Sequence, residues 1–417
     1  MHSVLLRSSI NNLTRSVRNY NILVVGAGIA GPALAYFLHR YGMQPVVVER
    51  ALELRLDGQT IDLRDEGKEV AWRMGIESKI REKMTHDQGV SIVDSAGRPQ
   101  ASFAVKDIGD KGYVAEFEIL RGEFANILYE QTRKNVEYVF NDYPESIDDH
   151  GDQVLVKFAS GNTRQFDLVV GADGIHSKTR RLVFANKSPI SYTNMYIAYF
   201  AIPCPDSDSK WSRWYNAPGG RCIILRPDNQ GSTRVLMFFR SNKRGYEFLD
   251  VDAQKSVLQK IFADAGFEAP RILRDLPNAD NFYLECAGQV KMDHWTQGRV
   301  ALVGDAGYCP SLLTGMGTNM AFVGAYILAG ELARHKDYSE AFKQYEILMR
   351  PYVTETQKLF PGYASVITPK TRVGIALRNA VLGFTSKPVI TPLVRKLLSK
   401  RTNNKFVLPN YEVSSTQ

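Results

Sequence analysis

The residues whose spacing is most specific for chemistry lie near the start of the chain. A glycine-rich turn, Gly-x-Gly-x-x-Gly, follows the apolar run 21–25, and its binding positions are Gly26, Gly28, Ala30 and Gly31. Glycines permit a tight turn and a close approach of the backbone to a pyrophosphate, and the following helix presents unpaired N–H groups to the phosphates. Glu49 ends the next apolar run, 18 residues after Gly31, where a carboxylate meets ribose hydroxyls. The pattern predicts a βαβ unit that binds a dinucleotide.

A second group of binding residues comes late in the chain. The apolar run 299–304 ends at Asp305, where a carboxylate can hold a ribityl hydroxyl, and a glycine-rich turn then opens an apolar helix. The binding residues expected in this turn are Gly315, Gly317, Thr318 and Asn319. Backbone N–H groups at a helix start stabilise negative charge that develops on a flavin ring during reduction. A dinucleotide bound in extended form across both turns explains the two motifs together.

A third strand-to-helix junction lies between these two. Asp173 and Gly174 follow the strand-like run 167–171, and Ser177 and Arg180 come shortly after them. One interpretation is a simple helix N-cap, because Asp and Ser are preferred at helix starts. The other interpretation, which the two flanking motifs favour, is that Asp173 and Gly174 contact the same dinucleotide.

In order and spacing, the three motifs resemble those of the group A flavoprotein hydroxylases, whose structural type is para-hydroxybenzoate hydroxylase. The resemblance covers roughly residues 21–410, and the chain is most similar to the branch of tetracycline-inactivating monooxygenases and polyketide hydroxylases. Four further residues match family positions that contact or lie near FAD: Arg50, Asp62, Arg64 and Arg121. One departure is Asp65, which stands where relatives usually carry glycine and leaves the shape of its loop open.

The resemblance implies the cofactors and the reaction. FAD is bound, and NADPH or NADH is a transient reductant, since the chain has no second glycine fingerprint for a separate nicotinamide domain. Reduced flavin then reacts with O2 to give a C4a-hydroperoxide, which delivers one oxygen atom to an activated ring or enol carbon. The flavin carries this chemistry, so no catalytic side chain is assigned and no metal is expected. The implied substrate is a planar aromatic, phenolic or polyketide-like molecule, with tetracycline as one example.

Two other functions stay open at this point. An FAD-dependent reductase or dehydrogenase on the same fold would reduce its substrate without incorporating oxygen. A non-catalytic flavin-binding protein would hold FAD without turning over NAD(P)H.

The elements that position the motifs indicate an α/β fold in several segments. We expect a Rossmann-like FAD-binding domain in two parts, residues 21–180 and 285–340. An antiparallel β-sheet substrate domain, residues 181–284, is inserted between them, because short aromatic and β-branched runs alternate with turn residues there. Segments near 60–115 are candidates to join this sheet.

The substrate chamber is expected under the inserted sheet. Its candidate lining residues are Phe200, Arg213, Tyr215, Arg221 and Phe238. Successive side chains of a strand alternate between the two faces of a sheet, so only about half of such residues can face the flavin.

Positive charge is concentrated at the two ends of the chain. The net charge is +8, yet residues 1–20 carry three arginines and residues 356–411 carry ten Lys or Arg, with no acid in either range. The rest of the chain is therefore net acidic, and no nucleic-acid partner is expected. Residues 341–417 are expected to be a C-terminal helical region, with basic amphipathic helices at 371–384 and 389–400. These helices are candidates to cover the chamber or to touch an anionic membrane surface.

Residues 1–20 and the four cysteines indicate where in the cell the protein is expected. Residues 1–20 are expected to be a leader outside the fold. They are amphipathic and rich in arginine, which is typical of a mitochondrial transit peptide; the alternatives are a leader of no consequence or a start codon placed too far upstream. The four cysteines lack disulfide-scaffold or zinc-like spacing, which favours a reducing, intracellular compartment, cytoplasmic if not mitochondrial. No apolar run approaches the roughly 18 residues of a membrane span.

Overall fold

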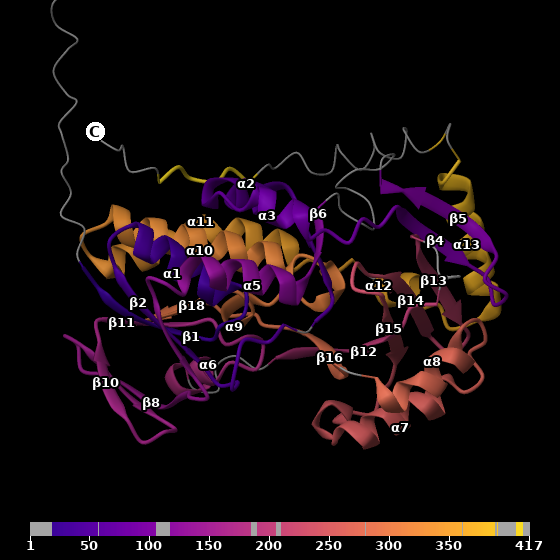
Figure 1. Ribbon diagram of the computed structural model, residues 1–417, viewed down its shortest axis with the longest axis horizontal. Coiled ribbons are helices and arrows are strands. Elements are labelled where there is room, and N and C mark those ends of the chain that lie inside the picture. Colours follow the sequence, from indigo (N-terminus) through magenta and orange to yellow (C-terminus); the bar gives the residue numbers. More distant parts are fainter. Residues whose placement is uncertain are drawn as a thin grey trace, which may run out of the picture.

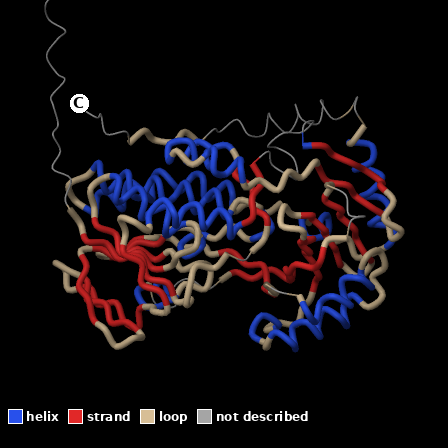
Figure 2. The backbone as a smooth tube through the Cα atoms, viewed as in Figure 1, coloured by secondary structure: helices blue, strands red, loops and turns tan. Residues whose placement is uncertain are grey.

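The computed structural model describes residues 19–56, 58–105, 117–184, 190–205, 210–279, 281–360, 362–387, 390 and 406–411. These residues form two units that lie side by side along the long axis of the molecule (Figure 1). One unit is a mainly parallel sheet between helices and a smaller sheet. The other unit is a mainly antiparallel sheet with helices at its outer side (Figure 2).

Valine-rich strands form the centre of the parallel sheet. β1 (Asn21–Val25) lies between β2 (Gln44–Glu49) and β11 (Leu168–Gly171) and pairs with both in parallel. Their apolar runs are buried, as expected for parallel strands covered on both faces. The sheet order is β17-β18-β11-β1-β2-β7, and the remaining strands are β7 (Glu137–Phe140), β17 (Thr296–Gln297) and β18 (Val300–Leu302).

Different layers cover the two faces of this sheet (Figure 1). The helices on one face are α1 (Ala30–Arg40), α5 (Arg121–Thr132), α10 (Gly317–Arg334) and α11 (Tyr338–Thr356). The elements on the other face are β8 (Pro144–Asp149), β9 (Val154–Phe158), β10 (Thr163–Phe166) and α6 (Lys178–Val183). Helix α10 is almost wholly buried, and Phe322 packs edge-to-face on Phe124 of α5 at 5.3 Å between ring centroids.

The second unit is built on a seven-stranded sheet with the order β16-β12-β15-β14-β13-β4-β5. Its strands are β4 (Gly89–Val93), β5 (Pro99–Ala104), β12 (Ser191–Pro203), β13 (Ser212–Ala217), β14 (Arg221–Pro227), β15 (Ser232–Arg240) and β16 (Tyr283–Gln289). Two details differ from the sequence interpretation. The pair β4–β13 is parallel, so the sheet is not purely antiparallel, and the boundary expected between residues 284 and 285 falls inside β16.

The two faces of the second sheet have different neighbours. One face packs against α7 (Val251–Phe262) and α8 (Ala269–Asp275), with the short helices η2 (Tyr246–Phe248) and η3 (Leu276–Asn278) beside them. The opposite face carries a separate apolar cluster that includes Ile197 and Phe238 and contacts Leu313 of the first unit. This second face therefore looks toward the nucleotide-binding turns.

A ribbon and short helices join the units. They are β3 (Thr60–Leu63), β6 (Phe117–Leu120), α2 (Asp65–Met74), α3 (Glu77–Glu82), α9 (Asp305–Tyr308) and η4 (Leu312–Thr314). Glu118 of β6 is buried and forms an ion pair with Arg226 of β14. Thr85 donates a hydrogen bond to the same carboxylate at 3.0 Å. The ribbon is thus fixed to the second sheet by buried charge.

The C-terminal part contains α12 (Tyr363–Ile367) and α13 (Arg372–Thr385), the latter where a basic helix is expected. The second expected helix, 389–400, lies outside the described residues except for Ile390. Residues 406–411 are not helical, in contrast to the expectation for 341–417. They lie on α10 and α2, where the carbonyl of Pro409 accepts hydrogen bonds from Tyr326 (2.9 Å) and Arg73 (2.6 Å).

Most of the expected leader lies outside the described residues, which begin at Asn19. Tyr20, however, is buried, and its hydroxyl donates a hydrogen bond to the carbonyl of Lys336 at 3.2 Å. The fold therefore includes at least one residue of the expected leader. Within the described ranges, no helix combines the length and apolar character needed to cross a membrane.

Candidate functional site

The turn between β1 and α1 brings three backbone segments into close contact. Gly26 has φ +108°, and a Cβ placed there would lie 2.6 Å from the carbonyl oxygen of Ala172. A Cβ at Gly31 would lie 1.9 Å from the carbonyl oxygen of Gly26. Only glycine fits at these two positions. The turn therefore packs against the end of β11 and leaves the N-terminus of α1, which includes Ala30, open to a phosphate.

Glu49 lies at the mouth of this turn. Its carboxylate accepts hydrogen bonds from the backbone N–H groups of Ala27 (2.8 Å) and Ala51 (3.0 Å). Each carboxylate oxygen has a further lone pair that can accept a ribose hydroxyl. The neighbouring Arg50 is exposed.

Arg121 reaches the same turn from the start of α5. Its guanidinium Nη2 lies 3.3 Å from the position of a Cβ at Gly28, and its side-chain carbons lie 3.1 Å from that of a Cβ at Gly58. The absence of side chains at both glycines gives the arginine room beside the turn. A guanidinium there is suited to a pyrophosphate, which it can bind with two parallel hydrogen bonds.

Asp305 follows β18 on the adjoining side of the sheet. Its Oδ1 is buried and has no hydrogen-bond partner among the described residues. Burial raises the pKa of this carboxyl, and the nearby Cys309 thiol and the charge of Arg121 oppose the rise only in part. A buried carboxylate oxygen without a donor is costly, so a ligand hydroxyl at this position would stabilise the site.

The start of α10 lies next to this carboxylate. A Cβ at Gly317 would lie 3.6 Å from Asp305 Oδ1, Gly315 has φ +66°, and Thr318 follows in the first turn. Asn319 is fully buried, and its Oδ1 accepts a hydrogen bond from the backbone N–H of Arg64 at 3.1 Å. Asn319 therefore joins α10 to the loop after β3 rather than pointing at open space.

The loop after β3 contains the departure noted in the sequence. Asp65 has φ +34°, in the left-handed region that favours glycine. Aspartate tolerates this region better than most residues, so the loop keeps a glycine-like backbone without the glycine. Arg64 forms an ion pair with Asp62 at 2.7 Å, and Asp62 Oδ1 is another buried oxygen without a partner in the described part of the chain.

For Asp173 the contacts match those of the N-cap interpretation. Its Oδ1 accepts a hydrogen bond from the Ser177 hydroxyl (2.5 Å), and its Oδ2 accepts one from the backbone N–H of Thr179 (2.9 Å) at the start of α6. Gly174 has φ +76° in the same turn. Arg180 donates a hydrogen bond to the carbonyl of Ala306 (2.7 Å), which fixes α6 to the segment that carries Asp305. The motif thus fixes α6 beside the segment that carries Asp305.

Two of these features fit FAD in particular. The glycine turn with Arg121 is a cradle that side chains would fill, which suits a pyrophosphate. The partnerless Oδ1 of Asp305 suits a hydroxyl of the ribityl chain, and it lies in a different segment from the glycine turn, as an extended dinucleotide requires. In the described part of the chain, no cluster of His, Cys, Asp and Glu side chains could hold a metal ion.

An open cavity of about 290 Å³ adjoins the turn before α10. Its lining includes Leu313, Thr314, Met316, Leu359, Phe360 and Tyr363. Leu313 also contacts the cluster on the second sheet that contains Phe238. The cavity therefore lies between the flavin-side turn and the C-terminal segment, close to the inner face of the second sheet.

Four of the five candidate lining residues lie on the other face of that sheet, so their predicted role is wrong. Phe200 and Tyr215 belong to the core under α7 and α8, and the Tyr215 hydroxyl donates to the carbonyl of Ala265 at 2.6 Å. Arg213 forms an ion pair with Glu268, the residue just before α8. Arg221 forms an ion pair with Asp264, two residues after the end of α7. Strand alternation sends these side chains outward, and only Phe238 faces the first unit.

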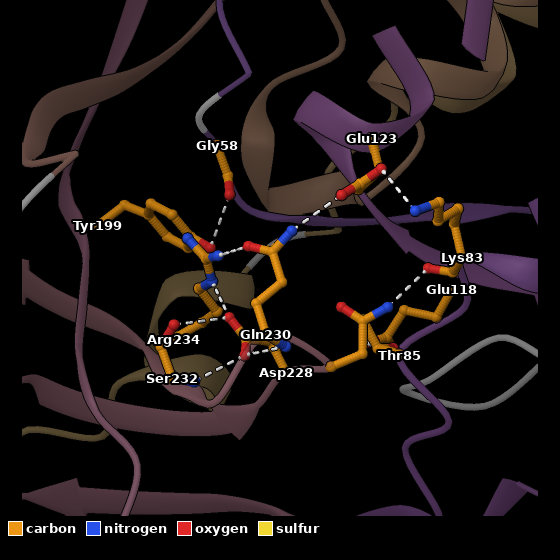
Figure 3. Close-up of polar contacts among 11 residues, drawn as sticks. Gly58, Lys83, Thr85, Glu118, Glu123, Tyr199, Asp228, Gln230, Ser232 and Arg234 are labelled. Atoms are coloured by element: carbon orange, nitrogen blue, oxygen red, sulfur yellow. Dashed lines mark hydrogen bonds and ion pairs between the residues drawn. The ribbon is translucent and has the colours of Figure 1, made fainter. Parts of the chain in front are cut away.

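Polar contacts hold the second sheet against the Arg121 segment (Figure 3). The Tyr199 hydroxyl donates to the carbonyl of Gly58 at 3.1 Å, and Gln230 donates to Glu123 of α5 at 2.9 Å. Arg234 supports this arrangement with hydrogen bonds to Gln230 (3.0 Å) and Asp228 (2.6 Å). Sequence reasoning missed these residues, because they share no motif and are brought together only by the fold.

Comparison with known proteins agrees with this geometry. The FAD binding domain family matches residues 19–356. A flavin-dependent monooxygenase of Legionella longbeachae is 37% identical over 401 residues, covering 95% of this chain and all of that protein. The FAD-dependent monooxygenase asL6 of Sarocladium schorii is 34% identical, covering 94% of this chain and 97% of that protein. The chain belongs to the FAD-dependent monooxygenase family.

The solved structures similar to this monooxygenase share its fold over nearly the full length. The tetracycline destructase Tet(51) is 34% identical, with a TM-score of 0.77 over 94% of this chain and 100% of that one. Tet(55) gives a TM-score of 0.78 at the same identity. The protein is therefore an FAD-dependent oxidoreductase with the para-hydroxybenzoate hydroxylase type of fold, as the sequence predicts.

Proposed function

We propose that this monooxygenase hydroxylates a planar phenolic, enolic or polyketide-like molecule, with NADPH or NADH as the reductant and O2 as the oxygen source. The observation that carries the proposal is the cavity beside the turn that opens α10. Its position next to the expected flavin edge, and its mainly apolar lining, suit a flat ring system. Similarity to two tetracycline destructases makes tetracycline-like compounds the first ones to test.

The glycine turn, Glu49 and Arg121 would hold the pyrophosphate and adenosine ribose of FAD. Asp305 and the start of α10 would hold its ribityl chain and flavin ring. When bound, FAD supplies the redox chemistry: it accepts a hydride and activates O2. The chain itself binds and orients both partners. The N-terminus of α10 places a positive dipole end and unpaired N–H groups where negative charge develops on reduction.

The cavity wall performs two further tasks. Leu313, Met316 and Phe360 offer apolar side chains against which a flat ring can pack. Tyr363 supplies the polar contact. Its side chain is buried, and its hydroxyl has no hydrogen-bond partner among the residues described.

Tyr363 is suited to donate a hydrogen bond to a substrate oxygen. Burial raises the pKa of its hydroxyl, so this group stays protonated throughout the neutral range. A donor at the wall of an apolar cavity fixes the orientation of a ring that carries a carbonyl or phenolate oxygen. Lys358, the cation of the cavity, forms an exposed ion pair with Glu355 at 2.6 Å instead.

The proposal is tested by NADPH oxidation in the FAD-loaded protein with a panel of planar phenols and enols, tetracyclines included. We expect at least one compound to accelerate oxidation and to gain the mass of one oxygen atom. Tyr363→Phe should raise the KM for that compound about fivefold, the loss of roughly 1 kcal/mol from one hydrogen bond. Tyr352→Phe is the matched control, because that buried tyrosine lies outside the cavity lining.

Two results would contradict the proposal. Reduction of the substrate without oxygen incorporation would identify a reductase. An unchanged KM in Tyr363→Phe, together with a raised KM in the control, would place the substrate elsewhere.

A further inference from the structure

Helix α13 exposes a continuous apolar face, called here the α13 face. It consists of Val373, Ala376, Leu377, Ala380, Val381 and Phe384. These residues follow the spacing of one helical side, and the four large ones are exposed by 78%, 66%, 55% and 57% in chain order. Polar residues are expected on the exposed side of a helix on a water-soluble surface. This helix shows the opposite arrangement.

The inner side of α13 is held by polar and close-packed contacts. Arg378 donates a hydrogen bond to Asn216 Oδ1 at 2.6 Å, and its guanidinium lies 5.0 Å from the ring centroid of Trp214. A Cβ at Gly383 would lie 2.9 Å from the carbonyl oxygen of Gln100 on β5. The orientation of the helix is therefore fixed by the fold, and the apolar face cannot turn inward without breaking these contacts.

Basic residues flank the α13 face at both ends. Lys370 and Arg372 lie at its N-terminal end and are exposed, and Lys387 lies at its C-terminal end with its ammonium 5.7 Å from the Phe384 ring centroid. Residues 356–411 contain ten Lys or Arg and no acidic residue. The partner that covers this face must therefore be apolar and negatively charged.

We propose that the α13 face is a docking surface for an anionic phospholipid bilayer. The large apolar side chains enter the boundary between headgroups and acyl chains, while Lys370, Arg372 and Lys387 contact the anionic headgroups. This combination of an apolar helical face with flanking cations is characteristic of helices that lie in the plane of a membrane interface. The proposal does not depend on the nature of the substrate.

Charge argues against the two other occupants. A second copy of this face would bring its own Lys370, Arg372 and Lys387 against the same cations. Residues 388–405 of this chain contain five Lys or Arg and no acid, so they would add positive charge to a surface that is already positive. Like charges at close range disfavour both contacts.

The test is co-sedimentation of the full-length, FAD-loaded protein with vesicles. One set contains phosphatidylcholine alone, and the other contains phosphatidylcholine with phosphatidylserine. We expect binding to the anionic set, weakened by salt because headgroup contacts are screened. Leu377→Gln with Phe384→Gln should lower the partition coefficient about 100-fold, about tenfold for each half-inserted side chain.

The matched control is Trp72→Gln with Ile347→Gln, which removes two exposed apolar side chains from α2 and α11. This variant should bind the anionic vesicles like the unchanged protein. Arg372→Gln with Lys387→Gln should weaken binding to them by about fivefold for each charge removed. Catalysis in free solution should be the same in all variants if they fold normally.

Several outcomes would overturn the proposal. They are failure of the unchanged protein to bind anionic vesicles, and equal binding by the Leu377/Phe384 variant. A dimer that only this variant loses would show that a second copy covers the face. A marked fall in its melting temperature without vesicles would show that another part of the chain covers it.

Discussion

Replacing Asp305 by asparagine should affect cofactor binding and the stability of the empty protein in opposite directions. The buried Oδ1 has no partner in the described structure and is placed to accept a ribityl hydroxyl. A hydrogen bond to a charged group contributes about 1.5–3 kcal/mol, which corresponds to roughly 10- to 100-fold in affinity. The amide oxygen of asparagine still accepts a hydrogen bond, worth about 1 kcal/mol, so we expect Asp305→Asn to weaken FAD binding by about tenfold, measured by titrating the stripped protein with FAD and following flavin fluorescence.

The cofactor-free protein should become more stable. The native state holds Asp305 in a buried place that raises its carboxyl pKa, so the folded chain binds this proton more tightly than the unfolded chain does. The contribution of the protonated Asp305 carboxyl to the free energy of unfolding is complete below the ordinary Asp pKa of about 3.8. It is lost as the pH rises through the raised pKa of the folded protein. Asparagine carries no such charge. Its advantage in melting temperature should be absent in acid and should grow toward neutral pH.

An exposed aspartate provides the control for the binding measurement. Asp252→Asn, in the first turn of α7, should leave FAD affinity unchanged. Undiminished FAD affinity in Asp305→Asn would refute the placement of the cofactor. A less stable cofactor-free variant at neutral pH would refute the argument from the unpaired buried oxygen.

Two further predictions concern the two faces of the second sheet and the backbone strain at Ser311 near the cavity. Phe200→Ala should lower the free energy of unfolding by about 3–5 kcal/mol with little change in KM, because this ring is buried under α7 and α8. Phe238→Ala should destabilise the protein and also change KM, because this ring lies on the face toward the first unit. Equal effects of the two on KM would contradict the assignment of faces. Ser311 is buried with φ +90°, and Ser311→Gly should raise the free energy of unfolding by about 1 kcal/mol by relieving this strain. A loss of stability in Ser311→Gly would show that the hydroxyl, not the backbone, decides the stability of this segment.

The geometry of the candidate cofactor site could be predicted because its signals are mostly local. Gly31 is required by its backbone contact with Gly26 within one turn, and Gly26 has the positive φ of +108° that the turn needs, so their spacing makes the turn visible. Asp305 and the start of α10 follow a short strand in the same way. Asp173 shows the limit of such reasoning: its carboxylate supports the start of α6 through Ser177 and Thr179, a role that residue type alone does not separate from contact with a ligand.

The substrate half could not be predicted because it depends on long-range packing. Alternation tells which residues share a face of a strand, but not which face the helices α7 and α8 will cover. The sequence therefore does not show that Phe200 lies under these helices and not in the chamber. The parallel contact of β4 with β13 joins segments more than a hundred residues apart. Most of the cavity lining comes from the turn before α10 and the loop before α12. Neither segment has the regular spacing of apolar residues from which a sequence predicts a buried face.

The most direct test of the proposed reaction is the fate of isotopically labelled O2 in the FAD-loaded enzyme, with NADPH and a substrate that accelerates its oxidation. Hydroxylation should give a product that carries one labelled oxygen atom, formed in proportion to the NADPH consumed. NADPH consumption that yields only hydrogen peroxide and unlabelled compound, with every such substrate, would contradict the proposed hydroxylation.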